Sequence, residues 1–215
     1  MYPPAIFSNT ELDQALEIAR RTKFSTLIAF GGDEIIVAHI PVTLVERASE
    51  NPQQDVKFLG HIMKSNPFFN LLAARDIDAK MMFLPANGYI SPGVYAEKKA
   101  NGKVVPTWNY VAAHFDGSMH LEDGPSSLRT ILDTQTSDFE EMVSSTWQVD
   151  DAPSDYIATL SKVIAGFSFK VSSWRFIRKL SQNRPDERDS IARWIKETQT
   201  PYSSLSTWME EALEN

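Results

Sequence analysis

Residues 25–42 constrain the fold most, because two β-type runs flank a tight turn signal there. The stretch reads STLIAFGGDEIIVAHIPV, with apolar and β-branched residues on both sides of Gly31-Gly32-Asp33. Gly and Asp are favoured in the short loops that connect antiparallel strands, since they accept the backbone angles of such turns. The stretch therefore predicts two antiparallel strands joined by a tight turn.

The rest of the chain alternates between further β-type segments and helical segments. Apolar periodicity predicts helices over 8–22, 125–143, 155–164, 184–197 and 204–214. Further strands are predicted over 76–85 and 165–174, and over 55–60 with a short helix after His61 that stops near Pro67. Antiparallel strands with helices between and after them predict an α+β fold around a small barrel or curved sheet.

The stretch 104–121 carries an unusual polar and aromatic run, VPTWNY at Val105–Tyr110. A half-buried strand alternates apolar and polar residues, whereas this run offers polar groups on both faces. Asp116-Gly117 is a two-residue turn signal, so we expect a β-hairpin that returns over Ser118–Leu121. Such a turn would make His114 and His120 cross-strand neighbours, and a two-histidine site there stays open.

Composition excludes several classes of function. The chain has 215 residues and no cysteine, which excludes disulfides, thiolate catalysis and cysteine-based metal sites. It shows no apolar run long enough to span a bilayer and no signal-peptide pattern, so we expect a cytoplasmic protein with no membrane partner. A net charge of −7 argues against direct DNA binding. Phosphate-loop, zinc-protease and serine-hydrolase motifs are also missing.

One segment runs against the acidic balance. Residues 170–196 hold eight Lys or Arg residues against three acidic ones. Such a segment is either a solvated helix face or an anion site, and the sequence leaves both readings open.

Four motifs in order resemble the PaiB-like family, which is described as FMN-binding negative transcriptional regulators. They are GHIMKSNP at Gly60–Pro67, YISPGVY at Tyr89–Tyr95, VPTWNY at Val105–Tyr110 and KLSQNR at Lys179–Arg184. The resemblance extends from Met1 to about Ile195. It implies an FMN-binding split β-barrel with flanking helices and a helical C-terminus. We expect residues 1–215 to form one domain, with 185–215 as a helical extension, and the protein to be a homodimer.

The resemblance also implies a set of FMN-binding residues and no catalytic or metal-binding side chain. The phosphate is expected at the start of a helix, where free N–H groups and the helix dipole favour anions. The isoalloxazine ring is expected against Trp108, and the C-terminal motif is expected to close the site. The full set is His61, Lys64, Ser65, Asn66, Tyr89, Ser91, Thr107, Trp108, Asn109, Lys179, Ser181, Gln182 and Asn183.

Each of these residue types also has a purely structural reading. Trp108 can be a core or interface ring, and His61 a hydrogen-bonded structural histidine. Asn66-Pro67 can mark a helix boundary, Tyr89 and Ser91 can shape the turn at Pro92, and residues 181–183 can cap the helix after Pro185.

Three functional hypotheses follow from the motifs. The first is an FMN-binding regulator or sensor, and the second is a small flavin-dependent oxidoreductase. The third is a cofactor-free structural or partner-binding protein, because Gly93-Val94 and Phe176-Ile177 replace a ring and a cation of the family pattern. Flavin absorbance separates the third hypothesis from the others, and NAD(P)H consumption separates the second from the first.

Overall fold

The chain is divided into two compact units, which are described separately. The computed structural model describes residues 4–9, 11–46, 56–122, 124–198 and 203–212. Unit 1 comprises Met1–Arg21, Leu84–Ala113 and Arg175–Asn215, and unit 2 comprises Thr22–Phe83 and His114–Trp174. The expectation of one domain with a helical extension at 185–215 stays a prediction.

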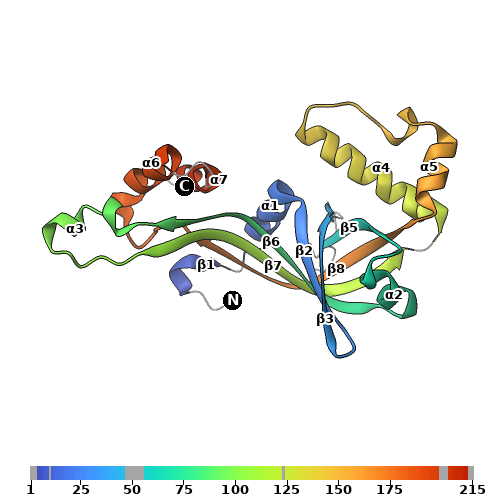
Figure 1. The fold of residues 1–215 in the computed structure, drawn as a ribbon, viewed down its shortest axis with the longest axis horizontal. Coiled ribbons are helices and arrows are strands. Elements are labelled where there is room, and N and C mark those ends of the chain that lie inside the picture. The colour runs from blue at the N-terminus through green and yellow to red at the C-terminus, as the bar shows by residue number, and fades with distance from the viewer. Residues whose placement is uncertain (1–3, 10, 47–55, 123, 199–202, 213–215) are drawn as a thin grey trace. The chain divides into compact units, whose positions relative to one another are not determined.

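In the described part of the chain, eight strands form the sheet (Figure 1), and their order is β3-β2-β6-β7-β8-β5-β4, with β1 paired to β8. All five pairs with a defined register are antiparallel. The three long strands β6, β7 and β8 contribute residues to both units. The strands are β1 (Ser8–Asn9), β2 (Phe24–Gly31), β3 (Glu34–Pro41), β4 (Thr43–Glu46), β5 (Val56–Met63), β6 (Ile77–Ile90), β7 (Thr107–Glu122) and β8 (Ile164–Lys179).

The helices confirm the α+β fold class. Within unit 1, α6 and α7 lie side by side (Figure 1). Within unit 2, α4 packs against β4 and β5. None of the helices in the described part of the chain is long and apolar enough to cross a membrane. The helices are α1 (Leu12–Thr22), α2 (Pro67–Ala74), α3 (Glu97–Ala100), α4 (Pro125–Met142), α5 (Ser154–Ser161), α6 (Arg188–Thr198) and α7 (Ser203–Glu211).

The predicted pair of strands around Gly31-Gly32-Asp33 is confirmed as the β2–β3 hairpin. Gly32 has a φ of 73°, which a turn residue without a Cβ adopts at little cost. Side chains alternate across the hairpin, and one face stays exposed. We call this the outer hairpin face; its large apolar members are Phe24, Ile28, Phe30, Ile35 and Val37, with Phe30 directly opposite Ile35 and Ile28 opposite Val37.

Aromatic packing holds the inside of unit 2 together. Phe58 lies at the centre, with ring centroids 5.6 Å from Phe83, 5.2 Å from Phe115 and 6.4 Å from Phe169. All four side chains are fully buried. In unit 1 the buried apolar side chains come mainly from α1, α6 and α7 and from the unit 1 ends of the long strands.

The predicted hairpin at Asp116-Gly117 is wrong, because β7 runs without a turn from Thr107 to Glu122. A Cβ on Gly117 would lie 2.2 Å from the main-chain oxygen of Lys170. The glycine therefore allows a close approach of β8, which is the other common reason for a glycine inside a strand. His114 and His120 lie on one strand, roughly 20 Å apart at about 3.3 Å per residue, so they form no cross-strand pair.

The short helix predicted between His61 and Pro67 is also wrong. Strand β5 continues to Met63, and α2 begins at Pro67 instead of ending there. Proline suits the first position of a helix, since its missing N–H would be unpaired there anyway. Asn66 caps this helix by accepting a hydrogen bond from the N–H of Phe68 at 3.0 Å.

Candidate functional site

The predicted site residues fall into two groups, one in each unit. His61, Lys64, Ser65 and Asn66 lie in unit 2, and the remaining predicted residues lie in unit 1.

A cavity of about 270 Å³ in unit 1 is lined by several residues of the motifs VPTWNY and KLSQNR. Lys179 donates a hydrogen bond from Nζ to Oγ1 of Thr107 at 2.6 Å. Asn109 is completely buried and donates from Nδ2 to Oγ of Ser181 at 2.8 Å. Asn183 also lines the cavity. The structure therefore brings together five residues from two segments that lie far apart in the sequence, one with Thr107 and Asn109 and the other with Lys179, Ser181 and Asn183.

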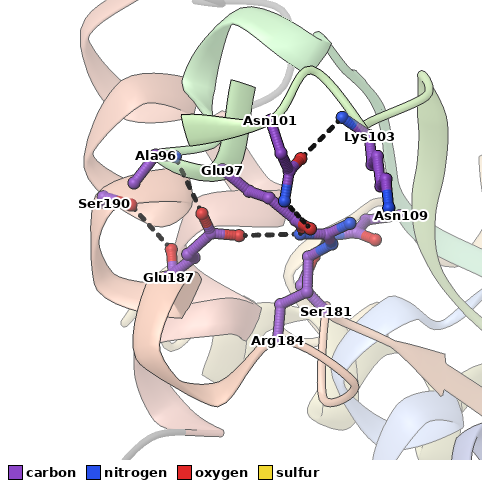
Figure 2. A network of polar contacts seen from close by, with 9 residues as sticks. All are labelled: Ala96, Glu97, Asn101, Lys103, Asn109, Ser181, Arg184, Glu187 and Ser190. Atoms are coloured by element: carbon purple, nitrogen blue, oxygen red, sulfur yellow. Dashed lines mark hydrogen bonds and ion pairs between the residues drawn. The ribbon is translucent and has the colours of Figure 1, made fainter. Parts of the chain in front are cut away.

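Arg184 lines the same cavity and is held by a polar network (Figure 2). Its Nη1 lies 3.1 Å from a carboxylate oxygen of Glu97 and 3.1 Å from one of Glu187. Its guanidinium also stacks 4.3 Å from the ring centre of Tyr95. Two carboxylates therefore pair with Arg184 and outnumber its charge, whereas Lys179 has no carboxylate partner among the described residues.

Two further members of the predicted set have structural roles beside this cavity. Gln182 accepts a hydrogen bond from the N–H of Leu180 at 2.7 Å and donates to the carbonyl of Arg178, which closes the turn after β8. Ser91 caps the short helical turn at Pro92–Val94 by accepting from the N–H of Gly93 at 3.2 Å.

Trp108 and Tyr89 form an exposed aromatic pair in unit 1. Their ring centroids lie 6.2 Å apart, and Nε1 of Trp108 donates to Oδ1 of Asn87 at 3.2 Å. Trp108 is 44% exposed, so part of its ring is open to solvent. Strand β7 thus alternates after all, with Trp108 outward and Asn109 inward, and the polar residue takes the buried position.

In unit 2, His61 lies on β5 and is tied to the helix α4. Its Nδ1 lies 2.7 Å from Oε1 of Gln135, and the Nε2 of this glutamine donates to the carbonyl of Pro41. This is the structural role that the sequence left open for His61. Ser65 is exposed in the turn between β5 and α2.

Lys64 lines a larger cavity of about 600 Å³ in unit 2. This lies within the roughly 300–1,000 Å³ that ligand pockets occupy. Apolar side chains form much of its wall, including Phe69, Leu121 and Leu128, while Lys162 and Glu122 add charges. Nζ of Lys64 donates a hydrogen bond to the main-chain carbonyl of Lys162 at 2.9 Å, so the Lys64 ammonium lies beside the backbone of Lys162.

The first turn of α4 reaches the same cavity, because Gly124 and Pro125 line it. Gly124 is the N-cap residue and has no side chain with which to cap the helix. An N-terminus of this kind attracts anions through its N–H groups and its dipole. The sequence predicted the start of this helix at Pro125, but neither the helix start nor Lys162 was among the expected FMN-binding residues.

The segment 170–196 does not form a single helix face. Its residues lie on β8 and on α6, and they belong to both units. Several of its cations are already engaged: Arg188 donates to the carbonyl of Ala212, and Lys196 pairs with Glu210. Within the described ranges, no group of three or more His, Asp or Glu residues is placed to hold a metal ion.

The comparison with protein families now identifies the class to which the fold and the cavities belong. Residues 1–173 match a family model described as "Putative FMN-binding domain", and the chain belongs to this family. This confirms the resemblance given by the four motifs.

Two relatives show how far the similarity extends. The chain is 26% identical over 216 residues to "Protease synthase and sporulation protein PAI 2" of Bacillus subtilis, which covers 100% of this chain and 97% of the relative. It is 29% identical over 181 residues to an uncharacterised protein of Emericella nidulans, which covers 72% of each chain.

Solved structures confirm the split-barrel fold. The FAD and heme binding protein of Mycobacterium smegmatis has a TM-score of 0.55 at 11% identity, covering 80% of this chain and 73% of that one. A conserved hypothetical protein of Mycobacterium tuberculosis has a TM-score of 0.53 at 8% identity, covering 83% and 91%. At these identities the likeness concerns the fold alone.

Proposed function

We propose that this protein binds FMN in the unit 2 cavity and acts as a flavin-loaded regulator or sensor. The observation that carries the proposal is the coincidence of three features in one cavity of about 600 Å³. These are the apolar wall, the two lysines Lys64 and Lys162, and the N-terminus of α4.

The residues of this cavity match the parts of FMN. A phosphate carries roughly 1.5 to 2 negative charges near neutral pH, and Lys64, Lys162 and the first turn of α4 can share it. Phe69 and the apolar wall can contact the faces of the isoalloxazine ring, and Glu122 can accept a hydrogen bond from a ring N–H. When bound, FMN supplies two-electron or one-electron redox chemistry.

That the unit 1 residues of the predicted set bind FMN stays a prediction. Trp108 offers a ring face, and Lys179 offers a cation. Binding of FMN and of a small carboxylic acid by Lys179→Met distinguishes whether Lys179 contacts FMN or another ligand.

Visible absorption spectroscopy tests flavin binding directly. The purified protein is mixed with FMN and passed through a desalting column. The fraction that contains the protein should then show the visible absorption bands of flavin. Free FMN would separate, so a colourless protein fraction after incubation with excess FMN would contradict the proposal and support the cofactor-free alternative.

The oxidoreductase alternative is supported by the same cavity, because one redox cofactor can serve either role. The FMN-loaded protein should leave NAD(P)H unconsumed under aerobic conditions if it is a sensor. Steady consumption of NAD(P)H that depends on added FMN would favour the oxidoreductase.

We expect weak binding to random duplex DNA. The net charge of −7 opposes contact with phosphates, and the cations of 170–196 are partly engaged. In a mobility-shift assay at physiological salt, non-specific dissociation constants should be no tighter than about 10⁻⁴ M. A shift at low protein concentration that disappears in the double variant Arg188→Glu/Arg193→Glu would contradict this.

We propose that a second copy of the chain covers the outer hairpin face. Phe30 is 67% exposed and Ile35 is 63% exposed, and they lie directly opposite each other. A contiguous apolar face on an edge hairpin is unusual on a monomer, and a symmetric pair of hairpins would bury it.

Light scattering should therefore give about twice the chain mass of 24.2 kDa. Ile35→Glu should shift the protein to the monomer, because two buried carboxylates would face the apolar surface of the partner. Glu34→Gln, on the neighbouring exposed position, is the matched control and should stay dimeric. A wild-type monomer at micromolar concentration would exclude the homodimer.

A further inference from the structure

The cavity of unit 1 contains a buried hydrogen-bond acceptor that has no donor. Asn109 is 0% exposed, and its Nδ2 faces Oγ of Ser181 at 2.8 Å and Sδ of Met209 at 3.8 Å. These two contacts occupy the nitrogen of the amide. No described residue donates to its Oδ1. Buried polar atoms without partners are rare, since each one costs free energy, and Asn109 is one of the residues that border the cavity.

The same cavity contains a cation without a counter-charge. The ammonium of Lys179 carries three donors, of which the hydroxyl of Thr107 takes one at 2.6 Å. The ring of Phe7 lies 5.9 Å from its Nζ. Burial lowers the pKa of Lys179, which shows that the charged form is disfavoured by its surroundings. In the described part of the chain no carboxylate pairs with it.

The neighbouring cation is not equivalent to Lys179. Arg184 lines the cavity too, but Glu97 and Glu187 hold it at 3.1 Å each (Figure 2), and Tyr95 stacks on it. This network fixes one wall, and because its two carboxylates outnumber the one guanidinium, Arg184 offers no unbalanced positive charge there. An anion that enters the cavity therefore meets its counter-charge at Lys179.

The size and the walls of the cavity limit what can bind. A volume of about 270 Å³ corresponds to roughly nine water molecules at about 30 Å³ each, which is the space of about ten non-hydrogen atoms. FMN, with three fused rings, a sugar chain and a phosphate, exceeds this space. Phe7, Val105 and Pro106 add apolar wall, which favours a ring or a branched chain.

We propose that this cavity binds a small carboxylic acid with an apolar body and one O–H or N–H group. The carboxylate would pair with Lys179, and the O–H or N–H would donate to Oδ1 of Asn109. This site lies within unit 1 and is independent of FMN binding in unit 2, so it gives the protein a second small ligand.

Hydroxybenzoates test the proposal, because they have the required size, a ring, one carboxylate and one donor. Isothermal titration calorimetry of the wild type should show binding of at least one of the 2-, 3- and 4-hydroxy isomers. That isomer should bind at least tenfold more tightly than benzoate, which lacks the donor. It should also bind at least tenfold more tightly than the matching hydroxybenzyl alcohol, which lacks the carboxylate.

Two variants assign the contacts. Lys179→Met keeps the length of the side chain and should weaken hydroxybenzoate binding at least tenfold, while Lys98→Met, an exposed control in unit 1, should change nothing. Asn109→Leu should bind hydroxybenzoate and benzoate equally. If Asn109→Leu does not fold, the comparison of the two acids on the wild type carries the same information.

The proposal is overturned if no isomer binds at millimolar concentration, if benzoate binds as well as the hydroxybenzoates, or if Lys179→Met has no effect. It is also overturned if Lys179→Met weakens FMN instead of the acid, because the cavity would then belong to FMN. Failure of the wild type to bind FMN leaves this test intact, so the two proposals fail separately.

Discussion

Lys64→Ala should weaken FMN binding by at least about tenfold. The loss of one charge-assisted contact to the phosphate typically costs about 1.5–3 kcal/mol, which is roughly 10- to 150-fold in affinity. Lys64 is exposed at the edge of the unit 2 cavity, so the loss should be larger at low salt than at high salt. Quenching of flavin fluorescence during a titration measures the affinity.

Riboflavin separates a phosphate contact from a folding defect. It lacks the phosphate, so its affinity should be nearly the same for Lys64→Ala and for the wild type. Lys57→Ala, on strand β5 before Lys64 and outside the cavity, should leave FMN binding unchanged. Equal losses of FMN and riboflavin would mean that Lys64 acts through folding. An unchanged FMN affinity would place the phosphate elsewhere.

Gly117→Ala should destabilise the protein by about 3 kcal/mol, because the new methyl group has no space. Its Cβ would lie 2.2 Å from the carbonyl oxygen of Lys170 and 2.8 Å from the ring of Phe169. The neighbours are a backbone and a buried ring, so neither can move without disturbing the packing of β7 against β8. For a chain of this length, the melting temperature should fall by about 6–12 °C.

Gly93→Ala is the matched control for this substitution. The nearest atom to a Cβ at Gly93 is Oγ of Ser91 at 3.4 Å, which is an ordinary contact. Its melting temperature should stay within about 2 °C of the wild type, or rise slightly through the reduced entropy of the unfolded chain. If both variants melt alike in a calorimetric scan, close approach of β8 is not what requires a glycine at 117.

The sequence predicted the elements better than their ends and turns. The β2–β3 hairpin and the helix α4 have strong local signals, and both are confirmed. The prediction of a turn at Asp116-Gly117 was wrong, because the neighbouring sequence does not distinguish a glycine inside a strand from a glycine in a turn. Only the approach of Lys170, more than fifty residues later, decides between them.

The candidate site shows the same limit. Thr107, Asn109, Lys179 and Ser181 were expected near one another because of the family motifs, and the structure places them around one cavity. Local sequence had no means of showing that Asn109 would keep an unpaired oxygen, since this depends on Ser181 and Met209. It also gave no sign that Lys162 and the start of α4 would meet Lys64.

The pairing of β1 with β8 bears on how the protein is made. Ser8 lies opposite Ile177, so the strand with which β1 pairs among the described residues is not complete until residue 177 has been synthesised. A ribosome that adds about 5–20 residues per second needs roughly 8 to 35 seconds for the distance between the two. During this time Ser8 and Asn9 cannot pair with β8, because Phe176 and Ile177, which are buried in the folded protein, have not yet been made. The pairing of β1 with β8 is therefore a late step in the making of the protein, which cannot precede the synthesis of residues 176 and 177.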